Sequence, residues 1–360
     1  MAPIRAHLLY LKDTSKYTIV ALCNSSVENA QAAIKAHGLP PTMKAYGSPQ
    51  DLADDLEIDL VVCSVRVDRH YETVVPLLKA GKDVFCEWPL GKNLAEAQEM
   101  EEIAKSKGVR TVVRLQVWQS PFGNKVKEIV ESGKIGKVLS TTFVGNPGFF
   151  GLKEPEYPAY TQDREIGRNM VTICFIHSMG AMLYALGELE SFNSVIEVKR
   201  PEVQLVDNTG KFVKTIPRTS HDQILVQGHL ASGALISYHL RGGAAFGCNE
   251  GLIWRIYGET GEIKVTASGT YLQIGHPDML IRLHDHSSGE TAAIALNEDG
   301  LGKLPLFSQN IGRIYEAFAD GKTSEYPDWS HAILRHKLVE EIYQREQDGT
   351  QETVARYVRV

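Results

Sequence analysis

The sequence predicts two domains of different architecture. Residues 1–115 have the pattern of a truncated Rossmann-like parallel sheet of the α/β class, and residues 116–360 that of an α+β domain with a large open, mostly antiparallel sheet. The first prediction comes from Asp59 to Glu87, where two short apolar runs flank one helix, as in a parallel βαβ unit. The second comes from the residues beyond Ser191, where strand-like runs follow one another through tight glycine turns.

Composition excludes several classes of protein. A chain of 360 residues with 43% hydrophobic residues can bury two cores. The formal net charge of −6 and the lack of a Lys/Arg run argue against nucleic acid or an acidic membrane as a partner. No stretch approaches the roughly 18 apolar residues that cross a bilayer, and the first residues contain no apolar leader. We therefore expect a cytoplasmic protein.

The cysteines indicate a reducing compartment. The chain has an odd number of cysteines without CxxC or CxxH spacing: Cys23, Cys63, Cys86, Cys174 and Cys248. The first three of them fall within predicted strands. Neither a disulfide framework nor a metal site is expected from this spacing.

The N-terminus departs from an ordinary dinucleotide-binding domain. Ala2–Arg5 is expected to begin a first strand, His7–Lys12 to be the tail of a first helix, and Tyr17–Cys23 to be the second strand. A glycine-rich turn that holds the pyrophosphate normally lies between the first strand and its helix. Here the first glycine is Gly38. Either the domain lacks its phosphate cradle or the sequence derives from an imperfect gene model, and the sequence does not distinguish these.

The rest of the chain follows the two architectures. In the first domain we expect helices at Val27–His37, Gln50–Leu56, Arg69–Ala80 and Leu94–Lys107, and strands at Leu60–Val65, Val84–Glu87 and Val109–Leu115. In the second we expect a helix and a strand within 120–145, strands at Ser194–Val198, Gln223–His229, Ala234–Leu240, Leu252–Tyr257, Glu262–Ala267 and Tyr271–Ile274, and closing helices at Ser308–Ala319 and Ser330–Gln347, which we expect to pack back on the first domain.

The motifs around the βαβ unit carry a family resemblance. The chain has His70 after one strand, and Ala80-Gly81-Lys82, Val84, Glu87 and Pro89 around the next. This pattern resembles the glucose-fructose oxidoreductase / inositol dehydrogenase family (Gfo/Idh/MocA), and in particular the branch that includes the fungal galactose-regulon repressor. Trp88 stands where the family typically has lysine, and Val65-Arg66-Val67 where it has Thr-Pro-Asn.

The resemblance implies an NAD(P)-dependent oxidoreductase, but some catalytic positions are replaced. Family dehydrogenases typically use that lysine together with an Asp and a His four residues apart on a helix. Here His177 is kept, whereas Ile173 holds the Asp position and Trp88 the lysine position. Neither replacement titrates near neutral pH. His177 is therefore the candidate catalytic acid or base, with a hydrogen-bonded core histidine as the alternative.

Two functions follow from this reading. The first is a small-molecule enzyme of fungal-type secondary metabolism, nominally an NAD(P)-dependent oxidoreductase. Its replaced positions leave two kinds of step open, hydride transfer and a non-redox step such as isomerisation, cyclisation or elimination. The alternative is a regulator, nuclear rather than cytoplasmic, that binds the peptide of a transcription activator. In either case the resemblance implies a homodimer formed through the C-terminal sheet.

The cofactor residues are expected at the carboxyl ends of the strands, where ligands of such sheets bind. Asn24 and Ser25 replace the acidic residue that favours NAD, so NADP is the expected dinucleotide unless none binds, and a helix cap at Ser25 or Ser26 is the alternative role. The other candidate cofactor-binding residues are Val65, Arg66, His70, Glu87 and Trp88. The alternative is that they stabilise the fold, as an ion pair, a helix start or a space-filling ring.

Overall fold

The computed structural model describes residues 3–247, 250–297 and 299–347, and Ala2 and Cys248 lie outside these ranges. The chain forms two compact units. Unit 1 comprises Met1–Gln119 and Asp299–His336, and unit 2 comprises Ser120–Glu298 and Lys337–Val360.

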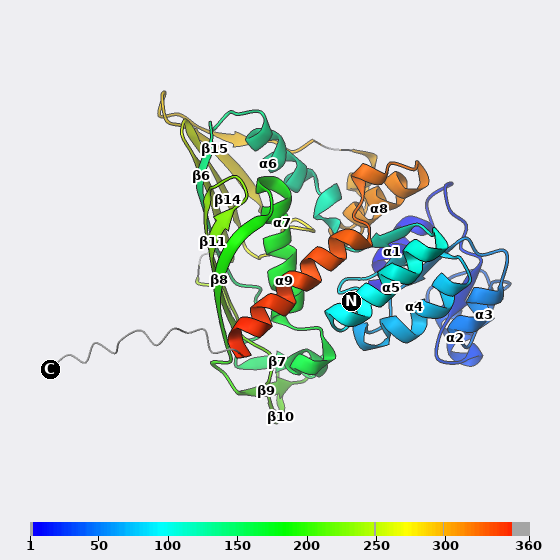
Figure 1. Ribbon diagram of the computed structural model, residues 1–360. Helices are drawn as coiled ribbons and strands as arrows, with labels where there is room; N and C mark the ends of the chain where they lie inside the picture. The colour runs from blue at the N-terminus through cyan, green and yellow to red at the C-terminus, as the bar shows by residue number, and fades with distance from the viewer. Residues whose placement is uncertain (1–2, 248–249, 298, 348–360) are drawn as a thin grey trace. The chain divides into compact units, whose positions relative to one another are not determined.

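Unit 1 is built from short parallel strands and covering helices (Figure 1). Its strands are β1 (Ala21–Cys23), β2 (Lys44–Tyr46), β3 (Leu60–Cys63), β4 (Asp83–Cys86) and β5 (Thr111–Val113). Its helices are α1 (Pro3–Leu11), α2 (Val27–Ala36), α3 (Pro49–Asp54), α4 (His70–Lys79), α5 (Leu94–Lys107) and α8 (Leu306–Ala319). Helix α9 (Trp329–Gln347) begins in this unit and continues into unit 2 beyond His336.

Local sequence signals set several of these boundaries. The Ser26 side chain accepts a hydrogen bond from the Asn29 amide and caps α2. Gly108 ends α5 in the left-handed conformation at φ 64°, which glycine adopts without steric cost. Both ends therefore lie where capping chemistry predicts them.

The parallel strands form two separate sheets. One contains β1 and β2 and the other has the order β3-β4-β5, and no strand among the described residues joins them. In a doubly wound sheet the first strand of the domain lies between these two sets. The predicted start of a strand at Ala2–Arg5 is wrong for its described residues, because α1 already begins at Pro3. Of the predicted Tyr17–Cys23 strand, only Ala21–Cys23 is paired as a strand, and its partner is β2.

Helix α1 packs against both half-sheets. Ala6 and Tyr10 lie in the core that contains Phe85 of β4, Val112 of β5 and much of α8. Leu8 lies in a second core with Ile34 and Leu39, next to Leu22 of β1. Residues four apart share a helical face, so the two stripes of α1 face two different cores. We infer that α1 holds together a sheet that has no central strand.

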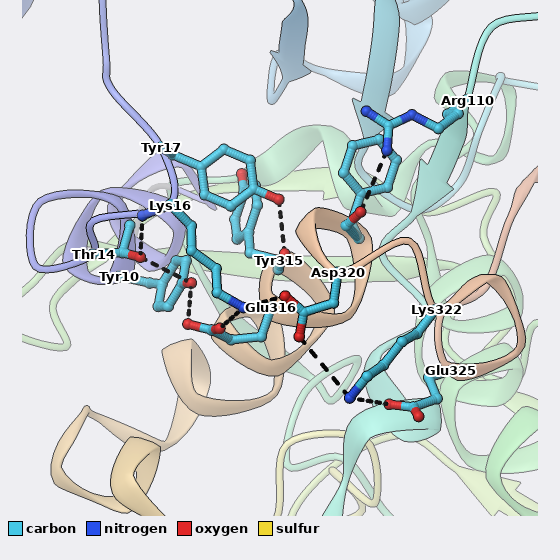
Figure 2. A network of polar contacts seen from close by, with 11 residues as sticks. Tyr10, Thr14, Lys16, Tyr17, Arg110, Tyr315, Glu316, Asp320, Lys322 and Glu325 are labelled. Atoms are coloured by element: carbon cyan, nitrogen blue, oxygen red, sulfur yellow. Dashed lines mark hydrogen bonds and ion pairs between the residues drawn. The ribbon is translucent and has the colours of Figure 1, made fainter.

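Polar contacts fix α1 and the segment after it to α8 (Figure 2). The Tyr10 hydroxyl donates to Glu316 over 2.5 Å, and Lys16 pairs with Glu316 over 2.6 Å and with Asp320. The Tyr17 hydroxyl donates to the backbone oxygen of Tyr315 over 2.7 Å. These bonds join residues about three hundred positions apart, so the start of the chain depends on α8 for its position.

Unit 2 is dominated by one sheet with the order β16-β15-β14-β13-β6-β12-β11-β8. The strands are β6 (Val138–Gly145), β8 (Leu189–Glu197), β11 (Gln223–Leu230), β12 (Leu235–Arg241), β13 (Leu252–Gly258), β14 (Gly261–Ala267), β15 (Leu280–Asp285) and β16 (Thr291–Ile294). All neighbours are antiparallel except β12 and β6. A smaller sheet, β10-β9-β7, contains β7 (Lys153–Pro155), β9 (Glu202–Val206) and β10 (Phe212–Pro217).

Two helices cover one face of the large sheet, α6 (Pro121–Glu131) and α7 (Ile176–Leu186) (Figure 1). Phe122 of α6 lies against Trp254, and the Ser178 hydroxyl of α7 bonds the Tyr238 hydroxyl over 2.6 Å. The opposite face is different. Among the described residues of this unit no helix covers it, and side chains such as Val144 and Leu235 are more than half exposed there.

The strand predicted at Tyr271–Ile274 is wrong. These residues form a turn in which the Gly275 amide donates to the Tyr271 oxygen over 2.8 Å. Both edges of β14 are already paired, one with β13 and the other with β15, so no edge is left for Tyr271–Ile274. The predicted fold class is confirmed: parallel Rossmann-like sheets precede a large mixed, mostly antiparallel one. No helix among the described residues is long and apolar enough to cross a membrane.

Candidate functional site

The carboxyl ends of β3, β4 and β5 bring three polar residues into one row. Cys63 pairs with Cys86, and Cys86 with Val113, so the next residue on each strand is also in register. Those residues are Ser64, Glu87 and Arg114. Ligands of parallel sheets bind at this edge. The row therefore lies at the edge of the sheet where a ligand of unit 1 would bind.

Glu87 is buried and fully engaged. Its carboxylate accepts from Nη1 of Arg114 at 3.1 and 2.8 Å and from Nε2 of His7 at 2.7 Å. Burial by itself raises the pKa of Glu87, but the Arg114 guanidinium and the His7 ring outweigh it and lower this pKa to about 2. Glu87 is therefore a carboxylate at any ordinary pH, and its charge is compensated within the protein.

His7 connects this carboxylate to helix α8. Its Nδ1 lies 2.8 Å from the hydroxyl of Tyr315, and the ring is completely buried. Burial lowers the pKa of His7 below 6.5, so the neutral ring is favoured. A neutral ring satisfies both contacts when Nε2–H donates to Glu87 and Nδ1 accepts from Tyr315. The result is a hydrogen-bond chain from α8 through α1 to the end of β4.

A second cluster lies on the opposite face of the same strand ends. Cys63 and Cys86 alternate with the residues facing α1, so they point toward α4, where His70 is the first residue. The sulfur of Cys86 lies 3.4 Å from Nδ1 of His70. The ligand atoms of all three buried residues lie within 4.8 Å of one another. His70, a predicted cofactor residue, is thus held in this cluster.

Trp88 occupies the family's lysine position as a buried ring. It is 5% exposed, and its centroid lies 4.8 Å from that of His336 on α9. Burial lowers the pKa of His336 to about 3, so the ring against the indole is neutral. Within unit 1 the arrangement matches the space-filling role of Trp88.

The other predicted cofactor residues lie apart from this row. Val65 is 46% exposed, and its carbonyl accepts from Nε2 of His70 over 3.1 Å. Arg66 forms a two-fold contact with the carboxylate of Asp68, at 2.5 and 2.6 Å. That carboxylate occupies much of the donor fork with which an arginine would grip a phosphate.

Asn24 and Ser25 follow β1, in the other parallel sheet. The Asn24 side chain accepts from the amide of Ser25 over 2.8 Å, and the Ser25 hydroxyl accepts from Asn29 over 2.9 Å. They are exposed, and Ser26 rather than Ser25 caps α2. Their hydrogen bonds organise the start of the helix.

His177 lies in unit 2 and is the second residue of α7. The helix is preceded by a π-helical segment, Met170–Phe175, whose start is capped by Asn169. The Asn169 oxygen accepts from two backbone amides and from the hydroxyl of Tyr343 over 3.2 Å. Single π-helical turns occur frequently at functional sites. His177 is half-buried at the end of this irregular turn, and Ile173 is within the turn.

The loop between β6 and α7 is anchored rather than loose. Arg218, which is 3% exposed, donates to the backbone oxygens of Phe150 and Gly151 at 3.1 and 2.7 Å and to the side chain of Gln162 at 2.7 Å. Phe150 has a positive φ of 62°, which the buried guanidinium helps to hold. The Pro- and Gly-rich sequence of this loop therefore encodes a fixed conformation in unit 2.

The residues before β1 do not fit a pyrophosphate cradle. Such a cradle needs a strand, a glycine turn and the N-terminus of a helix. In the described part of this segment, from Pro3 onward, neither a strand nor a glycine precedes β1. The described residues therefore include the sheet edge of a dinucleotide-binding domain but not the usual strand, glycine turn and helix N-terminus ahead of β1.

Sequence reasoning missed His7, Arg114 and Tyr315. Arg114 carried a usable signal, because it directly follows a predicted strand, as Glu87 does. His7 and Tyr315 carried none, since they lie 308 positions apart and only the tertiary fold brings them together.

Two family models match the chain. The oxidoreductase family with an NAD-binding Rossmann fold matches residues 4–115, and the C-terminal domain of Gal80p matches residues 121–267. The two matches cover the parallel sheets and most of the large sheet, respectively.

Similar proteins include both an enzyme and a regulator. Dehydrogenase aclE of Aspergillus oryzae is 30% identical over 93% of this chain and 88% of its own length. The galactose/lactose metabolism regulatory protein GAL80 of Saccharomyces cerevisiae is 26% identical over 94% of this chain and 88% of its length. A crystal structure of a super-repressor mutant of Gal80p from the same yeast aligns with a TM-score of 0.87, at 24% identity, over 97% of this chain and 94% of that one.

Proposed function

We propose, from the premise that this chain belongs to the Gfo/Idh/MocA oxidoreductase family, that it is a small-molecule enzyme whose step is a proton transfer rather than a hydride transfer. The reaction class is isomerisation, cyclisation or elimination, with His177 as acid or base. The observation that carries the proposal is Trp88, a buried indole at the position of the family's lysine.

Ordinary dehydrogenation needs groups that this chain does not provide. Removing hydride from a carbinol carbon requires a base for the hydroxyl proton, and the family's lysine and aspartate positions hold Trp88 and Ile173. Neither side chain exchanges protons near neutral pH. A nicotinamide dinucleotide would supply the hydride acceptor, and the described residues before β1, from Pro3 onward, do not form the cradle that would hold its phosphates. If a dinucleotide does bind, Asn24 and Ser25 favour NADP.

His177 has the chemistry for a non-redox step. An imidazole side chain can both accept and return a proton. Its place at the end of a π-helical turn, capped by Asn169, fixes the backbone that carries it. Enolisation, ring closure and elimination each need such a group beside an acidic C–H or O–H.

Product mass tests this proposal. The purified protein is incubated with phenolic, enolisable and polyol compounds, with and without NADP⁺, and the products are identified by mass spectrometry. We expect a product of unchanged mass, or one that has lost water, in the absence of dinucleotide. His177→Ala should reduce the rate by about 10²-fold or more, whereas His229→Ala, an exposed histidine on β11, should not. A product that has lost hydrogen, formed together with reduced dinucleotide, would refute the proposal.

A regulator is the second candidate. The likeness to GAL80 extends over 94% of this chain, and the Gal80p C-terminal domain model matches 121–267. The partner would be an acidic activator peptide. Fluorescence anisotropy with a labelled acidic amphipathic peptide tests this, with a scrambled peptide of the same charge as control. Equal binding of the two peptides would count against a regulator.

The uncovered face of the large sheet is the surface that we propose for a homodimer. One row crosses the sheet in register and is mainly apolar: Val195, Leu225, His239, Val144, Ile253, Thr266 and Leu280. Exposed apolar rows of this kind favour association. Light scattering after size exclusion should give twice the chain mass, and Val144→Lys should shift it toward the monomer. A wild-type chain that is monomeric at high concentration would exclude this interface.

A further inference from the structure

The cluster of Cys63, His70 and Cys86 is not used by the proposed chemistry. Its three ligating atoms lie within 4.8 Å of one another, and each residue is at most 2% exposed. The residues come from three elements: Cys63 from β3, Cys86 from β4, and His70 from the start of α4. Sequence spacing gave no sign of the cluster, because 23 positions separate the cysteines and the sheet alone places them opposite each other.

The hydrogen bonds of His70 leave one ring nitrogen in an unusual position. Nε2 lies 3.1 Å from the carbonyl oxygen of Val65 and donates to it when the ring proton is on this nitrogen. Nδ1 faces the carbonyl oxygens of Pro89 at 3.0 Å and Leu90 at 3.2 Å, and the sulfur of Cys86 at 3.4 Å. In that tautomer the lone pair of Nδ1 can accept the Cys86 thiol proton or bind a metal cation.

The chemistry of the donors selects among cations. Two thiols and an imidazole are the ligands preferred by Zn²⁺ and other borderline or soft metals, whereas Mg²⁺ and Ca²⁺ prefer oxygen. Two thiolates also neutralise a divalent ion, which reduces the cost of burying its charge. A metal-bound histidine normally donates its other N–H to a carbonyl, as His70 does to Val65.

The geometry requires only small movements. Zn–S bonds of about 2.3 Å and Zn–N bonds of about 2.0 Å place tetrahedral ligand atoms roughly 3.5 to 4 Å apart. The present separations, up to 4.8 Å, close to that range with small side-chain rotations. The carbonyl oxygens of Pro89 and Leu90 already face Nδ1 and are placed to complete the fourth position.

We propose that Cys63, His70 and Cys86 form a buried binding site for a thiophilic divalent cation, with zinc as the expected ion. The site joins the ends of β3 and β4 to the start of α4 and the turn at Pro89 and Leu90. It lies on the face of β4 opposite Glu87, so the ion acts on the stability of the strand ends and not as a Lewis acid beside Glu87.

Cobalt is the probe for this site. The full chain is freed of metal with a chelator under reducing conditions and titrated with Co²⁺. We expect one equivalent to bind, with a thiolate-to-cobalt charge-transfer band, and one equivalent of Zn²⁺ to displace it. Cys63→Ser and Cys86→Ser should lose most of the band intensity. Cys23→Ser, a half-buried cysteine on β1, should retain all of it.

A measurement on the wild-type chain keeps the test valid if the variants fail to fold. Zinc should raise the Tm of the metal-free protein at one equivalent, and Mg²⁺ at the same concentration should not. Absence of a charge-transfer band together with an unchanged Tm would overturn the proposal. A band that survives in both Cys63→Ser and Cys86→Ser would overturn it as well.

Discussion

The two faces of β4 carry two clusters of buried polar groups, and these groups are stabilised in different ways. On the α1 side, the charges of Glu87 and Arg114 compensate each other and His7 donates to the same carboxylate, through bonds of 2.7 to 3.1 Å. On the α4 side, Cys63, Cys86 and His70 bury three groups able to bind a metal. The first cluster is compensated by residues of the chain, whereas the second is the site that we propose for a cation. Their responses to mutation, pH and metal should therefore differ.

The largest effect is expected on the α1 side. Glu87→Ala removes the carboxylate and leaves Arg114 buried without its partner, which should lower the free energy of unfolding by about 3 to 5 kcal/mol. Urea denaturation at neutral pH measures it. The matched control is Glu262→Ala, which breaks the surface pair with Arg255 and should cost about 1 kcal/mol or less. Equal losses of unfolding free energy in the two variants would mean that the buried network stabilises the fold no more than a surface ion pair does.

Acid should reduce the stability contributed by the cluster on the α1 side in two stages. The pKa of His7 is lowered from 6.5 in the folded chain, so the unfolded chain binds the extra proton and stability falls as pH drops below about 6.5. The pKa of Glu87 is lowered from 4.5 to about 2, so its contribution is complete above pH 4.5 and is lost as pH falls toward 2. Unfolding monitored over this pH range should show a shallower slope between pH 6.5 and 4.5 in His7→Gln. An unchanged slope would show that His7 is not the titrating group.

A smaller loss is expected when the network is shortened at α8. Tyr315→Phe keeps the packed ring but removes the hydroxyl that donates to Nδ1 of His7, and it should cost about 1 to 3 kcal/mol because a buried acceptor loses its partner. Tyr71→Phe is the control, since its hydroxyl bonds Glu99 at the surface. Chemical denaturation of both variants compares them. A larger loss in Tyr71→Phe would contradict the buried chain of hydrogen bonds.

The smallest effect without metal is expected on the α4 side. In chelator, Cys86→Ala should cost about 1 to 2 kcal/mol through lost packing. With zinc the difference in stability between the wild type and Cys86→Ala should increase, because only the wild type is stabilised by binding the ion. Thermal unfolding with and without zinc gives both values. A gap that stays constant would indicate that the two faces of β4 do not differ in their need for a cation.

The local elements of the fold followed the sequence closely, and the errors share one cause. The helix Leu94–Lys107 has the predicted bounds, because a capping residue and a glycine mark its ends. The errors at Ala2–Arg5 and Tyr271–Ile274 concern strands, which exist only where a partner edge is available. The sequence of a four-residue segment does not show whether the edge of another strand is available to pair with it.

The candidate site was predictable in part. Glu87 was recognised because it follows a strand, and Trp88 because it replaces an expected lysine. The role of Glu87 was predictable only in part, since an ion pair was one expectation but its partners, His7 and Arg114, were not foreseen. The grouping of Cys63, His70 and Cys86 depends on strand register, which spacing along the chain does not encode.

The sequence by itself determined the family, the order of most helices and strands, and the replacement of the family's lysine and aspartate by Trp88 and Ile173, because each of these is written in neighbouring residues. Only the tertiary structure decided that α1 spans two half-sheets, that His7 hydrogen-bonds Glu87 from 80 positions away, and that two cysteines meet one histidine. Such contacts follow from how strands align and which helix faces are buried, and those depend on the whole chain at once.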